Sequence, residues 1–188
     1  MKSRMIPVLC ILLLFLTACQ KQTSDDPIVA SYKDTQIHES LVAYEKQNQI
    51  NVTGDKTVSD ADALDQLLLN LIMLDEAEQR GLSVTQEEVA AELAGQRKNY
   101  EEYEEVRSYI EEWCTKMGIT TEQYFDMVAE QLPRRMLRQR LRDTLGQEYC
   151  QQHGLEFTKV NPPEQMTEYV EQYLDGLLQA HRSEIKYY

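Results

Sequence analysis

The most apolar stretch of the chain follows a helical pattern over residues 59–82. Its aliphatic side chains recur at three- and four-residue steps, and Leu69 and Leu74 widen this stripe almost to the full circumference of a helix. Ser59 is placed to cap the first turn, and Gly81 followed by Leu82 is typical of a helix end. We therefore predict a central helix that other helices surround. The stripe consists of Leu64, Leu67, Leu68, Leu71, Ile72 and Met73.

Capping residues predict where further helices begin. Thr85 and Thr120 each precede a glutamate or glutamine by three residues, which is the pattern of a capping box. Gly95, followed by a polar stretch, leaves open whether the segment after Thr85 forms one helix or two. Pro133 is expected to kink the helix that begins at Thr120. Two more helices are predicted at 39–49 and 164–180.

Short segments rich in strand-forming residues lie near both ends of the chain. Residues 28–32 are expected to form a strand, followed by a turn at 33–35 and a return strand near Ile37. Residues 184–188 also favour a strand, and a lone terminal strand would be unstable. We therefore predict that the two ends pair, which gives a mostly α protein with a small β element formed by N- and C-terminal strands.

The first residues match a bacterial export signal. Lys2 and Arg4 precede an uncharged aliphatic stretch that is too short to span a bilayer, which needs roughly 20 apolar residues. The sequence Leu-Thr-Ala-Cys at 16–19 then resembles the lipobox of bacterial lipoproteins, whose cysteine receives diacylglycerol. An ordinary cleaved signal or an uncleaved anchor is the alternative. We expect a signal peptide at 1–18, a tether at 19–27 and a single helical domain at 28–188, with lipid attached to Cys19.

The chain is acidic, with a formal net charge of −13. Such a charge repels nucleic acid and anionic lipid head groups, so we expect no nucleic-acid partner and a membrane attachment that depends on the lipid. Residues 134–142 are an exception, because they hold five arginines in nine residues. These arginines either pair with the glutamate-rich helix across the fold or form a patch for acidic client segments or an anionic polymer.

Few residues suggest catalytic or metal chemistry. Beyond the signal and Cys19, the cysteines are Cys114 and Cys150, whose apolar helical positions favour two buried thiols over one disulfide. The acidic runs are typical of solvated helix faces. We predict no enzymatic activity, no cofactor and no metal site. The histidines lie in different predicted elements without metal-binding spacing, at His38, His153 and His181.

The order of these signals resembles a known family of exported chaperones. A strand-turn-strand, the central helix with Glu-Ala at 76–77, the run Arg-Gly-Leu-Ser-Val-Thr at 80–85, Glu-Glu-Val at 87–89 and Gly-Ile-Thr at 118–120 are similar to the N-terminal domain of SurA-type periplasmic chaperones. The lipobox makes the chain more similar to PrsA-type foldase lipoproteins. The resemblance covers residues 28–154. The chain lacks the parvulin isomerase domain of that family, because at most ten residues separate Gly154 from Glu164.

The resemblance implies a helical cradle that binds unfolded exported polypeptides without catalysis. We therefore expect a holdase outside the cytoplasmic membrane, anchored to it by lipid on Cys19. The alternative is a dedicated adaptor lipoprotein of an envelope complex that uses the same fold as a scaffold. Tyrosine and methionine suit a surface for varied peptides. The candidate peptide-binding residues, between the long helices, are Tyr100, Tyr103, Tyr124 and Met127.

Overall fold

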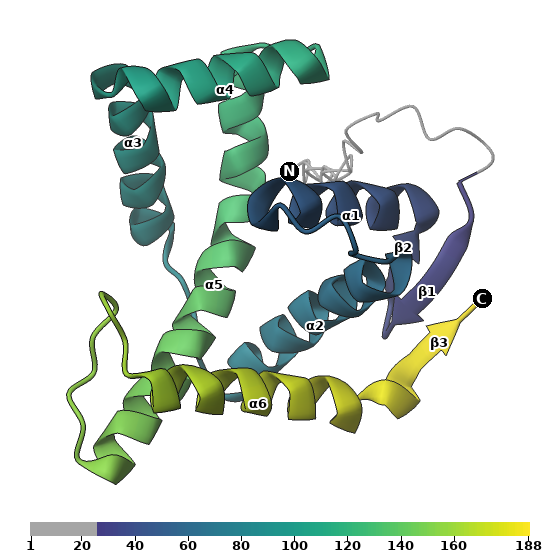
Figure 1. Ribbon diagram of the computed structural model, residues 1–188, viewed down its shortest axis with the longest axis vertical. Coiled ribbons are helices and arrows are strands. Elements are labelled where there is room, and N and C mark those ends of the chain that lie inside the picture. The colour runs from purple at the N-terminus through teal and green to yellow at the C-terminus, as the bar shows by residue number, and fades with distance from the viewer. Residues whose placement is uncertain (1–25) are drawn as a thin grey trace, which may run out of the picture.

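A computed structural model describes residues 26–188 (Figure 1). The predicted signal peptide, the attachment site at Cys19 and most of the tether lie outside these residues. The chain forms mostly helices and one small sheet, as predicted. In order, the elements are β1 (Ile28–Tyr32), β2 (Thr35–His38), α1 (Glu39–Thr53), α2 (Asp60–Gln79), α3 (Gln86–Glu102), α4 (Glu104–Met117), α5 (Thr121–His153), α6 (Glu164–Ala180), a short 3-10 turn (Arg182–Glu184) and β3 (Ile185–Tyr187).

The sheet joins the two ends of the described chain. β1 lies in the centre and pairs antiparallel with β2 on one side and β3 on the other, with Tyr32 opposite both Thr35 and Ile185. The backbone N–H of Tyr188 extends this pairing by donating to the carbonyl of Val29 at 3.0 Å. The predicted pairing of the terminal strands is therefore confirmed.

α2 begins and ends at the residues that its sequence indicates. The Ser59 hydroxyl accepts from the backbone N–H of Asp62, whose carboxylate accepts from the N–H of Ser59 at 2.8 Å. At the other end Gly81 has a φ of +70°, and the N–H of Leu82 donates to the carbonyl of Ala77 at 2.9 Å. This is the Schellman arrangement, in which glycine takes the left-handed conformation that other residues adopt at a cost.

The main core surrounds α2, which packs on α5, α6, α1 and the sheet (Figure 1). Leu68 and Ile72 of α2 are fully buried there, together with Leu141 of α5 and Leu174 of α6. A second, smaller core holds α3, α4 and the N-terminal part of α5, around Phe125. We call this second unit the arm. The long helix α5 passes through both cores and so links the arm to the rest of the fold.

The capping boxes at Thr85 and Thr120 form as predicted. The segment after Thr85 forms two helices, but the break between them is not at Gly95: α3 runs through Gly95 and ends at Tyr103, whose φ of −110° and ψ of 114° are extended. The reason is Arg107, which donates to the carbonyls of Tyr100 and Glu101 and satisfies the end of α3.

Three further predictions concern the length of α1, the proline in α5 and the two cysteines. α1 is longer than predicted and ends at Gly54, which has a φ of +74°. α5 continues through Pro133. Cys114 and Cys150 are buried free thiols, so no disulfide joins them. Within residues 26–188 no helix is long and apolar enough to cross a membrane.

Candidate functional site

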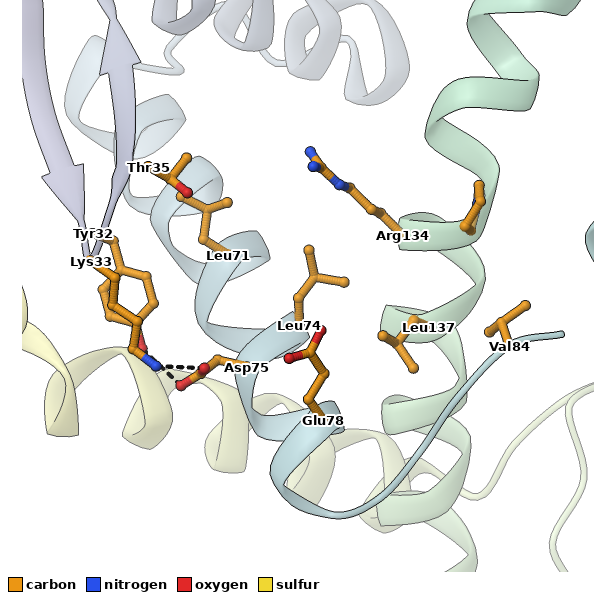
Figure 2. A pocket seen from close by; sticks show the side chains of 11 residues that line it. Tyr32, Lys33, Thr35, Leu71, Leu74, Asp75, Glu78, Val84, Arg134 and Leu137 are labelled. Carbon is orange, nitrogen blue, oxygen red and sulfur yellow. Dashed lines mark hydrogen bonds and ion pairs between the residues drawn. The ribbon is translucent and has the colours of Figure 1, made fainter. Parts of the chain in front are cut away.

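An open groove of about 380 Å³ lies between the β1–β2 hairpin, α2 and α5 (Figure 2). Its floor is apolar and its rim is charged. The apolar lining consists of Leu71, Leu74, Val84, Pro133 and Leu137, and the polar lining consists of Tyr32, Lys33, Thr35, Asp75, Glu78 and Arg134.

Helical spacing places the groove side chains on common faces. Leu71, Leu74 and Glu78 of α2 follow three- and four-residue steps, as do Pro133 and Leu137 of α5. The buried face of α2, with Leu68 and Ile72, belongs to the main core, whereas Leu71 and Leu74 are only half-buried. The breadth of the apolar stripe on α2 was therefore the sequence signal for this site. The flank of α2 that carries Leu71 and Leu74 was expected to be covered by other helices, but it lines the groove.

A polar network fixes the hairpin end of the groove. Lys33 Nζ lies 2.5 Å from Asp75 Oδ1, and the Tyr32 hydroxyl donates to Asp75 Oδ2 at 3.2 Å. The Lys33 hydrogen bond, followed by those from Tyr32 and Gln79, holds the pKa of the Asp75 carboxyl below its usual range. Burial and the nearby negative charge of Asp75 raise the pKa of Tyr32. Asp75 is therefore ionised and fully engaged by groups of the protein, so it does not serve as a free ligand.

The arginines of the described residues fall into two groups. Most contact a carboxylate or backbone carbonyls: for instance, Arg140 pairs with Glu88 at 2.5 Å and Arg142 with Glu171 at 2.6 Å. Three have no hydrogen bond or ion pair with any residue in 26–188, and all three lie on neighbouring turns of α5: Arg134, Arg135 and Arg138. The remaining contacting arginines are Arg80, Arg97, Arg107 and Arg182.

This division agrees with the first interpretation of the 134–142 cluster for one arginine only. Arg140 pairs with Glu88, in the first turn of the glutamate-rich helix α3, whereas Arg142 pairs with Glu171 of α6. Arg134 reaches toward the groove (Figure 2). Burial, the largest cause, and the neighbouring arginines lower the pKa of Arg138, which is half-buried.

The four tyrosine and methionine candidates lie in the arm and do not line this groove. Tyr100 and Tyr124 pack edge-to-face on Phe125, with ring centroids 5.7 and 5.2 Å apart. Burial raises the pKa of Tyr124. Tyr103 and Met127 are exposed on the arm. Peptide contact at these four residues stays a prediction, and the groove residues are an additional candidate surface that the sequence reasoning missed.

The histidines serve three separate local contacts. His38 Nδ1 lies 3.0 Å from the carbonyl oxygen of Asp26, His153 stacks on Tyr149, and His181 Nδ1 lies 2.8 Å from a carboxylate oxygen of Glu184. In the part of the chain that the structure describes, no cluster of three or more His, Cys, Asp or Glu residues could hold a metal ion.

A second cavity of about 270 Å³ lies between α5, residues 157–162 and α6. Its charged rim groups pair with each other, as Lys159 does with Asp143 and Arg142 does with Glu171. The groove between the hairpin, α2 and α5 therefore has the stronger case as a binding site, because its cationic group Arg134 stays unpaired within the described residues.

Comparisons of the chain with protein-family models, with curated proteins and with solved structures find no match.

Proposed function

We propose that the protein is a lipid-anchored extracytoplasmic holdase, which binds extended apolar segments of exported polypeptides and releases them without covalent chemistry. The observation that carries this proposal is the groove, in which half-buried leucines of two helices remain open to solvent beneath a charged rim. A volume of about 380 Å³ lies in the range of roughly 300–1,000 Å³ that is usual for ligand sites.

The size of the floor fits weak and unselective binding. Burying one large aliphatic or aromatic side chain stabilises a complex by about 1.5–3 kcal/mol, and association itself costs at least about 4 kcal/mol. A groove that accepts one or two such side chains therefore gives weak affinity, which suits a chaperone that must release its clients. The resemblance to SurA-type and PrsA-type proteins supports the same function, and the lipobox at Cys19 supports its place at the membrane.

The test is suppression of aggregation of a reduced, unfolding lysozyme, followed by light scattering. In the variant Leu74→Gln, which keeps the side-chain size but makes the floor polar, we expect weaker suppression. Val52→Gln is the matched control, because Val52 is 77% exposed on α1 and lies outside the groove lining. Val52→Gln should melt within about 2 °C of the parent, since surface substitutions change stability by less than about 0.5 kcal/mol. Leu74 is half-buried, so thermal melting of Leu74→Gln checks that this variant is folded at the assay temperature.

Two results would overturn the proposal. One is no suppression by the parent protein at a tenfold molar excess. The other result is that the protein does not bind any of a panel of unrelated unfolded peptides but binds a single folded partner, as a dedicated adaptor would.

A further inference from the structure

The groove has an uncompensated positive charge in a protein that is otherwise acidic. The formal net charge is −13, yet Arg134, at the groove, and Arg138, four residues later, have no carboxylate partner within residues 26–188. Residues four apart lie on the same face of a helix, so their side chains are neighbours on α5. Arg134 lines the groove, and Arg138 lies one turn further along α5, just outside the lining residues.

Arg138 lies near one carboxylate but forms no ion pair with it. Glu45 of α1 is close enough to influence the pKa of Arg138, but no ion pair forms, and the Glu45 carboxylate accepts from the Gln49 side chain at 3.1 Å instead. An arginine that is partly removed from water without a counter-ion costs free energy, and a carboxylate that binds beside it recovers part of that cost. The planar guanidinium also matches the two oxygens of a carboxylate.

On the basis of the proposed function, we propose that the groove selects extended client segments that carry an aspartate or glutamate beside a large apolar residue. The carboxylate binds to Arg134 and Arg138, and the apolar side chain lies on Leu74 and its neighbours. In the view of Figure 2, Arg134 and Glu78 lie on opposite sides of Leu74. The groove therefore has a cationic and an anionic side, which orients a bound segment.

The charge distribution favours a peptide over an anionic polymer as the ligand. A polymer with a charge on every repeat would extend beyond the two arginines and meet Glu78 and the acidic surface of the protein, which repel it. A peptide segment with one carboxylate brings a single charge to the arginines and avoids this repulsion.

The experiment compares two fluorescent decapeptides that differ at one position, with glutamate or glutamine between leucine and phenylalanine, by fluorescence anisotropy. The parent protein should bind the glutamate peptide about tenfold more tightly, which corresponds to one charge-assisted contact. In Arg134→Gln and Arg138→Gln this preference should fall to about one, and Arg138→Lys should keep part of it.

Arg135→Gln is the matched control, because it removes the same charge from the same helix. Arg135 is about 100° around the helix from Arg134 and lies close enough to Tyr124 of the arm to influence its pKa. This variant should keep the tenfold preference. Thermal melting checks that each variant folds, and Arg138→Gln should not melt below the parent because it removes a half-buried charge that has no ion pair within residues 26–188.

The outcomes separate this inference from the function on which it rests. If the parent binds both peptides equally, the selection of acidic segments is wrong and the holdase function stands. If it binds neither, the holdase function fails as well. If polyphosphate binds more tightly than the glutamate peptide and Arg135→Gln weakens it as much as Arg134→Gln does, the arginines form a general polyanion surface and the inference is overturned.

Discussion

Gly146 allows α5 to approach its neighbours, and we predict that alanine at this position cannot give the stabilisation that a helical alanine usually gives. A Cβ atom at Gly146 would lie 3.0 Å from Met166 Sδ and 3.1 Å from a ring carbon of Phe157. Gly95 in α3 is the matched control, since a Cβ there would meet no atom within 4 Å. Neither glycine has a positive φ, so alanine fits both backbones.

The expected magnitudes follow from two opposing effects. Replacing a helical glycine by alanine stabilises by roughly 0.5–1 kcal/mol, largely by restricting the unfolded chain, and this gain is common to both sites. Overpacking a core typically costs about 1–3 kcal/mol, and the flexible Met166 side chain places Gly146→Ala near the lower end. Gly95→Ala should therefore raise the free energy of unfolding, and Gly146→Ala should fall about 1–2 kcal/mol below it.

The assay is urea unfolding followed by circular dichroism, with thermal melting as a second measure. A gap of 1–2 kcal/mol between the two variants corresponds to roughly 2–8 °C in melting temperature for a chain of this size. Met166→Ala should remove part of the gap in a double-mutant cycle, because it removes the sulfur and methyl atoms of Met166 but leaves the ring of Phe157 in place. Equal stabilisation by both alanines would refute the reasoning.

Three other predictions concern the ion pairs, caps and charge of the fold. The pKa of Asp75 is below its ordinary value of 3.8 in the folded protein, so the stability that its contacts provide is complete above pH 3.8. This stability is lost as the pH falls through the lower pKa of the folded state. The urea midpoint of unfolding should therefore decline below about pH 4, and it should decline less steeply in Asp75→Asn. Arg80→Met should lower the free energy of unfolding by about 1–2 kcal/mol, because Arg80 contacts Glu76, Glu148 and Tyr173 on three helices. Lys116→Met, which removes an exposed ion pair, should lower it by much less when it is measured in the same way. Thr120→Ala should cost about 1 kcal/mol by removing a capping box, and Thr120→Ser should restore most of it; equal melting temperatures for all three proteins would contradict this assignment.

The local features of this fold could be predicted from the sequence because they depend on few neighbouring residues. Capping-box patterns predicted the helix starts at Thr85 and Thr120, and Ser59 as a capping residue predicted the start of α2. Glycine before an apolar residue predicted helix ends such as that at Gly81. The pairing of β1 with β3 was also predictable, since a single terminal strand has no stable alternative. The break between α3 and α4 was not, because it depends on the side chain of Arg107 reaching back to two carbonyls.

The groove could not be located from the sequence because its walls come from segments far apart in the chain. Tyr32, Leu74 and Arg134 meet only when the hairpin, α2 and α5 have packed. Whether an arginine forms an ion pair also depends on how distant segments pack. Arg140 and Arg134 belong to one run of sequence, but of these two only Arg140 pairs with a carboxylate, that of Glu88. The sequence identified the cluster, and tertiary packing decides which members remain available.

Helix α2 contributes to stability through one face and to the proposed binding through another. Leu68 and Ile72 of α2 are fully excluded from water, so truncating them would leave cavities and cost about 2–5 kcal/mol. Leu71 and Leu74, on the groove flank, are half-buried and keep part of their surface in solvent, so their contribution to folding is smaller. Arg134 and Arg138 add no ion pair within the described residues, so substituting them removes no such contact from the fold. Binding and folding are thus separable here by substitution, which allows the groove to be tested without unfolding the protein that carries it.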